Sequence, residues 1–113
     1  MSTRSRIARL LDDGSYRSIY CHFGGDLVGQ ILRDHFPNES DAREIINLGD
    51  ISFISNEGPK AYRSTGAPWV EVRPKHSSNL QALLNLAYEV DAEFLYYWQE
   101  GQWHTIQMNG PRR

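Results

Sequence analysis

The sequence predicts an α+β domain in which an antiparallel sheet, built from N- and C-terminal hairpins, carries about three helices packed on one face. Strand-like runs flank Asp13-Gly14 near the N-terminus and Glu100-Gly101 near the C-terminus, and such dipeptides form tight hairpin turns. Between the two hairpins, apolar residues recur at spacings of three and four, as in helices. Strands joined by hairpins rather than by crossovers disfavour a parallel βαβ array.

The first hairpin is predicted from two runs rich in Ile, Leu and Tyr, Ser5 to Leu11 and Tyr16 to Phe23. Side chains alternate between the faces of a strand, so Ile19, Cys21 and Phe23 share one face of the second run. We expect this face to be the core side.

Two short helices are predicted next. The first runs from Leu27 to Phe36, with Asp26 as its N-cap and Pro37 as its stop. In the second, Asn38 and Asp41 form a capping box, and a C-terminal glycine follows an apolar face made by Ala42, Ile45 and Ile46.

The middle of the chain has weaker signals. Asp50 to Ser55 predicts a short strand, and Asn56 to Pro68 has turn residues at both ends and is predicted to be an irregular loop. Trp69 to Arg73 alternates and predicts a short or edge strand, which Pro74 ends because proline lacks the ladder N–H.

The last third predicts a core helix and the second hairpin. Ser78 and Gln81 form a capping box, and a single stripe is formed by Leu80, Leu83, Leu84, Ala87 and Tyr88. The hairpin strands are Ala92 to Gln99 and Gln102 to Met108. Residues 109–113 are predicted to be a flexible polar tail, and residues 1–113 a single domain.

Composition excludes several function classes. The chain has 113 residues, a formal net charge of −2 and a pI near 6.0, so a nucleic-acid role would need a local basic patch. A single cysteine excludes an intramolecular disulfide and a cysteine-only zinc site. No apolar run approaches the roughly 18 residues of a membrane span, and the first six residues are polar, which predicts a cytoplasmic protein without a membrane partner.

The residues with catalytic or ligand chemistry form no recognised motif. Cys21 and His22 are adjacent on a strand and point to opposite faces, so Cys21 is interpreted as a core residue. The cysteine and the four histidines lack metal-site spacing, and Gly24 to Gly29 lacks both the Gly-Lys-Ser/Thr ending and the G-x-G-x-x-G spacing of phosphate loops. We therefore expect no cofactor, metal or catalytic set, and a small enzyme using Cys21 or a histidine is the third hypothesis.

The unusual feature is an aromatic content of 12%. In the last hairpin both strand faces carry large side chains, and helices on one side would leave several aromatics solvent-facing. Exposed Tyr and Trp anchor protein interfaces and also stack on unpaired bases. The other interpretation is that these aromatics form cross-strand pairs that stabilise the sheet.

The predicted partner-binding residues combine these aromatics with nearby polar side chains: Tyr16, Tyr20, His22, Tyr96, Trp98, Trp103, Arg4 and Arg6. Arg4 and Arg6 share a strand face, as would suit a phosphate patch or a charged sheet edge. The first hypothesis is a non-enzymatic protein that binds a host protein through these aromatics and the Asn56 to Pro68 loop. The alternative is a single-stranded nucleic-acid-binding module that uses the sheet aromatics and N-terminal arginines.

One stretch carries a family resemblance. Ser18-Ile19-Tyr20-Cys21-His22-Phe23, the glycine turn, the following helix and Leu48-Gly49-Asp50-Ile51-Ser52 resemble a family of small proteins encoded by phages, prophages and plasmids. Phe23 stands where that family usually has tryptophan, the turn is shorter, and Asn56 to Pro74 has no counterpart. The resemblance implies a mobile-element accessory protein, and such proteins often bind and block a host defence complex such as a CRISPR effector.

Overall fold

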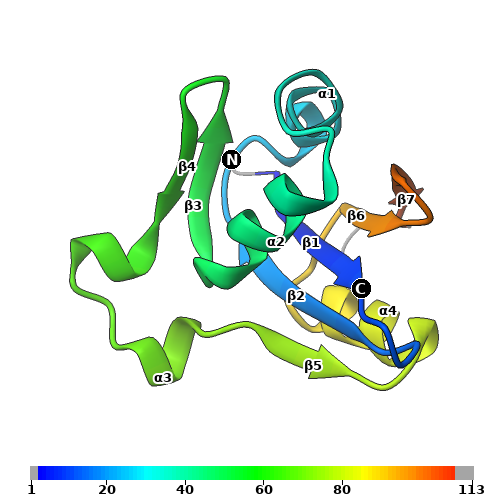
Figure 1. The fold of residues 1–113 in the computed structure, drawn as a ribbon. Coiled ribbons are helices and arrows are strands. Elements are labelled where there is room, and N and C mark those ends of the chain that lie inside the picture. Colours follow the sequence, from blue (N-terminus) through cyan, green and yellow to red (C-terminus); the bar gives the residue numbers. More distant parts are fainter. Residues whose placement is uncertain (1–2, 109–113) are drawn as a thin grey trace.

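The N-terminal hairpin forms the middle of the sheet. The structure is a computed structural model that describes residues 3–108 (Figure 1). Strands β1 (Ser5–Leu10) and β2 (Tyr16–Cys21) pair antiparallel from Ser5 opposite Cys21 to Leu10 opposite Tyr16. Gly14 adopts a φ of 88° in the connecting turn, a conformation that glycine tolerates. The predicted hairpin is confirmed.

The C-terminal hairpin is also confirmed, but its place in the sheet makes the sheet mixed. Strands β6 (Phe94–Gln99) and β7 (Gln102–Gln107) are antiparallel, with positive φ at both turn residues, Glu100 and Gly101. β6 lies beside β1 and runs parallel to it, from Ser5 opposite Phe94 to Arg9 opposite Trp98. The predicted α+β fold is confirmed, and its sheet is mostly antiparallel; it is mixed at this pair because the chain crosses over before β6 and then enters in the direction of β1.

Three short strands extend the other side of the seven-stranded sheet, whose order is β4-β3-β2-β1-β6-β7 with β5 also paired to β2. β3 (Ile51–Ser55) and β4 (Gly58–Ala61) form an antiparallel hairpin. β3 pairs parallel with β2 at Cys21, and β5 (Lys75–Ser77) pairs antiparallel with β2 from Tyr16 to Ser18. β3 and β5 therefore pair with opposite ends of β2.

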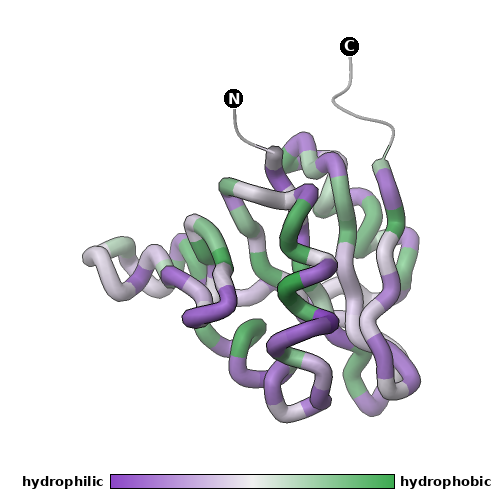
Figure 2. Tube along the Cα trace, turned by 90° about the horizontal axis from the view of Figure 1, so that it is seen from above, coloured by the Kyte–Doolittle hydropathy of each residue, from purple (hydrophilic) through white to green (hydrophobic). Residues whose placement is uncertain are grey.

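The stretch predicted as a loop and a strand folds differently. Asn56 to Pro68 contains β4 and a 3₁₀ turn, η1 (Tyr62–Thr65), and Trp69 to Arg73 is not a strand. It forms a one-turn helix, α3 (Trp69–Val72), because Pro68 fixes the backbone at its start and the Arg73 N–H donates to the Trp69 carbonyl at 2.8 Å. The segment from η1 to α3 projects at the left of both Figure 1 and Figure 2.

Helices cover both faces of the sheet, so the prediction of helices on one face is wrong. Helices α1 (Gly25–His35) and α2 (Glu39–Asn47) pack on a core that contains Ile7 and Ile19, whereas α4 (Leu80–Glu89) packs on a second core that contains Ala8 and Leu95. Neighbouring residues of one strand thus enter different cores. Figure 2 shows hydrophobic and hydrophilic residues interspersed along the tube.

The helix starts agree with the sequence in one case and differ in two. The capping box of Asn38 and Asp41 is present at α2. The N-cap of α1 is Gly24 rather than Asp26. At α4 the N-cap is Asn79, whose side chain accepts from the Ala82 N–H at 2.9 Å, so the predicted Ser78 and Gln81 box is wrong.

Candidate functional site

Four of the predicted partner-binding aromatics lie inside the protein. Tyr16, Tyr96, Trp98 and Trp103 are each at most 8% exposed, so the prediction that they face solvent is wrong. The reason is that α1 and α2 cover the sheet face that holds Tyr96, Trp98 and Trp103, and α4 covers the face that holds Tyr16. These four side chains therefore contact the interior of the protein and not a partner.

These contacts fit the other interpretation of the aromatics, cross-strand pairing. Trp98 and Trp103 lie opposite each other on β6 and β7, with ring centroids 5.5 Å apart at 73°. The Trp103 indole N–H donates to the Phe36 carbonyl at 2.8 Å, and the Tyr96 hydroxyl donates to the Gly25 carbonyl at 2.5 Å. The rings therefore fix both α1 and the chain that follows it to the C-terminal hairpin.

Arg6 is also internal, at 1% exposed. Its Nε donates to the Ser18 hydroxyl at 2.8 Å, and burial lowers the pKa of its guanidinium, although Asp50 and Glu89 oppose that shift. Both interpretations of Arg4 and Arg6, a charged sheet edge and a phosphate patch, are therefore wrong for Arg6, because β1 lies between β2 and β6 and this guanidinium is already used within the sheet.

The remaining three predicted residues, Arg4, Tyr20 and His22, are half-buried and lie together near the start of β1 and the end of β2. The Tyr20 hydroxyl lies 2.6 Å from His22 Nδ1, and the His22 ring meets the exposed Phe23 ring at a centroid distance of 4.4 Å. Burial raises the pKa of Tyr20, and the positive charge of Arg4 acts against that rise. Of the predicted partner-binding residues, only Tyr20, His22 and Arg4 thus remain near the surface, with the exposed Phe23 ring beside them.

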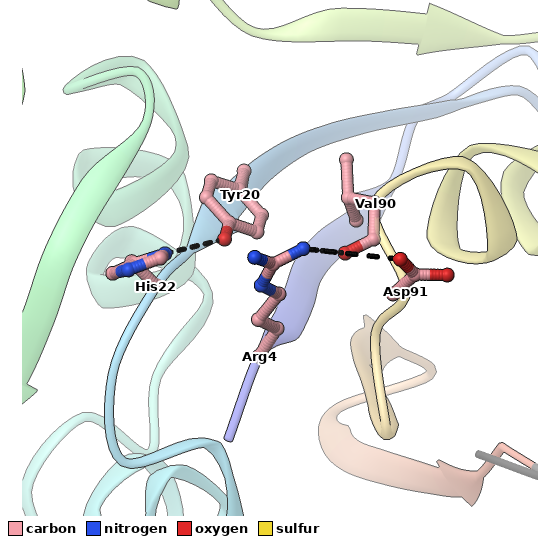
Figure 3. Close-up of polar contacts among 5 residues, drawn as sticks. All are labelled: Arg4, Tyr20, His22, Val90 and Asp91. Atoms are coloured by element: carbon pink, nitrogen blue, oxygen red, sulfur yellow. Dashed lines mark hydrogen bonds and ion pairs between the residues drawn. The ribbon is translucent and has the colours of Figure 1, made fainter. Parts of the chain in front are cut away.

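Arg4 is held in place from the other side (Figure 3). Its Nη1 donates to the Val90 carbonyl at 3.3 Å and lies 3.9 Å from a carboxylate oxygen of Asp91. Arg4 therefore lies between Tyr20 and the segment that follows α4, where its charge is partly neutralised.

Cys21 is a buried core residue, as the sequence indicated. Burial raises the pKa of its thiol to about 11, so the thiol stays protonated near neutral pH and is a weak nucleophile. The His22 ring is hydrogen-bonded to the Tyr20 hydroxyl and not to Cys21. Among residues 3–108, no group of three or more His, Cys, Asp or Glu is placed to hold a metal ion.

A cavity of about 480 Å³ lies between α2 and the segment from β4 to η1. Asp41, Glu44 and Ile45 of α2 and its C-cap Leu48 line it, and the spacing of three, four and seven residues puts them on one side of the helix. Sequence reasoning assigned only the apolar part of this face to the core, and the acidic pair at the same spacing was the missed signal.

The cavity, which we call the α2–β4 groove, has an apolar floor and a charged rim. Phe36, Ile45, Leu48 and Pro59 supply the apolar surface. Asp41 and Glu44 stand on the α2 side, and Arg63 of η1 is the cationic residue of the lining. Two residues of the predicted loop, Pro59 and Arg63, thus form one wall of a concave site.

No protein-family model matches this chain, and no curated protein or solved structure is significantly similar to it. The resemblance to proteins of mobile elements therefore stays a prediction. Within residues 3–108, no helix is both long and apolar enough to span a membrane.

Proposed function

We propose that this chain is a non-enzymatic binding protein whose α2–β4 groove receives a segment of a host protein. The observation that carries the proposal is the groove itself, which combines a concave apolar floor with charged groups at its rim. This is the usual composition of a site that admits one apolar side chain and orients it through polar contacts.

The groove also defines the chemistry of the partner. Burying one Leu or Phe side chain against Phe36, Ile45 and Leu48 contributes about 2 kcal/mol. Asp41 and Glu44 on the rim favour a basic residue beside that anchor. The preferred segment therefore carries an apolar anchor flanked by Lys or Arg.

The biological role that we propose is inhibition of a host defence complex in the cytoplasm, of the CRISPR-effector type, by protein contact. The resemblance of Ser18 to Phe23 and Leu48 to Ser52 to small mobile-element proteins supports this role. The groove supports the mechanism, because its wall comes from the Asn56 to Pro68 stretch that the sequence predicted to contact a partner.

A substitution that fills the groove tests the proposal. Glu44 is an exposed α2 residue that lines this cavity, so Glu44→Trp should occlude the groove without entering the core. Asp34→Trp, an equally exposed carboxylate on α1, is the matched control. The tagged variants are expressed in a host with active CRISPR interference, and transformation by a targeted plasmid is measured together with the host proteins that co-purify.

We expect the wild type and Asp34→Trp to raise transformation and retain one host complex, and Glu44→Trp to lose both. The proposal is contradicted if Glu44→Trp performs as the control does, or if the wild type neither protects the plasmid nor retains a complex.

A further inference from the structure

Basic residues gather around α3 and β5 and on the part of the N-terminal hairpin that lies beside β5. Arg9 and Arg17 lie directly opposite each other on β1 and β2, and Arg17 lies opposite His76 of β5. Arg73 and Lys75 follow α3 and border the same cavity as Arg17 and His76. We call these five residues the basic strip.

The strip borders two adjoining cavities. The larger, about 570 Å³, is lined by Arg17, Arg73, Lys75 and His76 with the apolar residues Val70 and Leu86 among its neighbours. The smaller, about 380 Å³, shares Arg17 and Arg73 and is bordered by Trp69. None of the described residues that line either cavity is acidic.

Asp50 and Asp13 attract Lys75 and His76 of the strip, but among the described residues no carboxylate forms an ion pair with any of its members. In the part of the chain that the structure describes, ion pairs form at Arg4 and Arg43, and Arg17, Arg73 and Lys75 form none. Burial and then the positive charges of Arg43 and Arg17 lower the pKa of Arg9, and Glu39 and Asp12 oppose this only in part. The Nε of Arg9 is moreover a buried donor without an acceptor. A ligand that brings negative charge would relieve this repulsion.

An exposed aromatic platform stands at one end of the strip. Trp69 of α3 is 43% exposed, and the guanidinium of Arg63 lies 5.0 Å from the centre of its ring. Nucleic-acid bases stack on aromatic rings and on guanidinium planes, whereas an acidic peptide can pair with the guanidinium but gains no specific contact from the ring. A row of cations ending at a flat platform is thus suited to a strand of phosphates and unpaired bases.

We propose that the basic strip and Trp69 bind a short single-stranded nucleic acid, with phosphates on Arg17, Arg73 and Lys75 and a base on the Trp69 and Arg63 platform. The site shares Arg63 with the α2–β4 groove and Arg17 with the N-terminal hairpin, but it uses none of the sheet aromatics and neither Arg4 nor Arg6. It supplies the local basic patch that a chain of net charge −2 needs for this role.

The salt dependence of binding gives a quantitative test. Each phosphate contact to a single strand contributes about −0.7 to the slope of log K against log salt, so three contacts predict about −2. The affinity for fluorescein-labelled oligo-dT of about 12 nucleotides, measured by anisotropy, should then fall about 20-fold between about 50 and about 200 mM salt. Trp69→Ala should weaken binding about tenfold with the slope unchanged.

The decisive variant is Arg73→Ser combined with Lys75→Ser, two exposed residues whose loss should leave the fold intact. One remaining contact predicts only about a threefold fall over the same salt range. Arg33→Ser with Lys60→Ser, equally exposed and with the same charge change, should bind as the wild type does. Glu44→Trp leaves Arg17, Arg73 and Lys75 in place, so it should keep the wild-type salt slope for oligo-dT, which separates this test from that of the groove.

The proposal is overturned if the wild type does not bind oligo-dT at low salt, or if the Arg73 and Lys75 double variant retains the wild-type slope. It is also overturned if polyglutamate displaces the labelled strand as well as unlabelled oligo-dT does. In that case the strip is a surface for an acidic protein.

Discussion

Replacing Leu83 by alanine tests the two-sided core. Leu83 is 0% exposed and belongs to the cluster that joins α4 to Ala8 and Leu95. Truncating a fully buried leucine in a packed core costs about 3 to 4 kcal/mol, from lost transfer free energy and the cavity left behind. The free energy of unfolding of a chain this size is about 6 to 17 kcal/mol, so the loss is a large fraction of it.

The neighbouring Leu84 provides the matched control, because it has the same chemistry on the same helix but is only half-buried. Leu84→Ala should cost about 1 kcal/mol. With an unfolding entropy of about 0.24 kcal/mol/K for 113 residues, Leu83→Ala should lower Tm by about 15 °C and Leu84→Ala by about 4 °C.

Urea unfolding followed by tryptophan fluorescence measures the difference, since Trp98 and Trp103 are buried. We expect the midpoint of Leu83→Ala to fall while the slope with denaturant stays constant. Equal and small effects of both substitutions would refute the reasoning, because they would mean that α4 does not close the second face of the sheet.

Two further predictions concern the interior. Burial raises the pKa of the Cys21 thiol in the native state to about 11, above its usual 9.0. The unfolded state therefore loses the thiol proton first, and up to about 3 kcal/mol of the free energy of unfolding is lost as pH rises from the unfolded pKa to the native one. Cys21→Ala should show a smaller fall in its urea midpoint from about pH 8 to about pH 10.5, and an equal fall would contradict the assignment. Gly29→Ala should lower Tm although alanine favours helix, because the new methyl would lie 2.6 Å from Cε1 of Tyr96 and overpacking costs about 1 to 3 kcal/mol. Gln30→Ala on the exposed face of α1 is the control, and a Gly29→Ala protein as stable as that control would show that Tyr96 moves aside at little cost.

Local signals predicted those elements whose causes are local. The turn at Asp13-Gly14, the capping box of Asn38 and Asp41 and the apolar stripe around Leu83 all act within a few residues, and each corresponds to an observed element. The prediction was wrong at Trp69 to Arg73, where five alternating residues fit one helical turn as well as a strand. The strand Lys75–Ser77 is too short to produce any periodic signal.

The site was harder to predict because it depends on which faces become covered. Both faces of β6 carry apolar or aromatic residues, with Tyr96 and Trp98 on one face and Leu95 on the other. The sequence therefore does not mark a solvent face, and only the tertiary arrangement shows that helices cover both. The α2–β4 groove and the basic strip each combine segments far apart in the chain, such as Arg17 with Arg73. No spacing rule within one segment could have joined them.

The parallel pairing of β1 with β6 has a consequence for how the protein is made. Residues 5–10 receive their second neighbour only when residues 94–99 have left the ribosome, so until then the N-terminal hairpin has one edge of β1 unpaired. A chain cut before β6 would expose the unpaired backbone N–H and C=O groups of β1, a strand that contains Ile7, to any other extended chain. Folding of this sheet is therefore completed only once β6 is available, and products cut before β6 are the form most prone to aggregate.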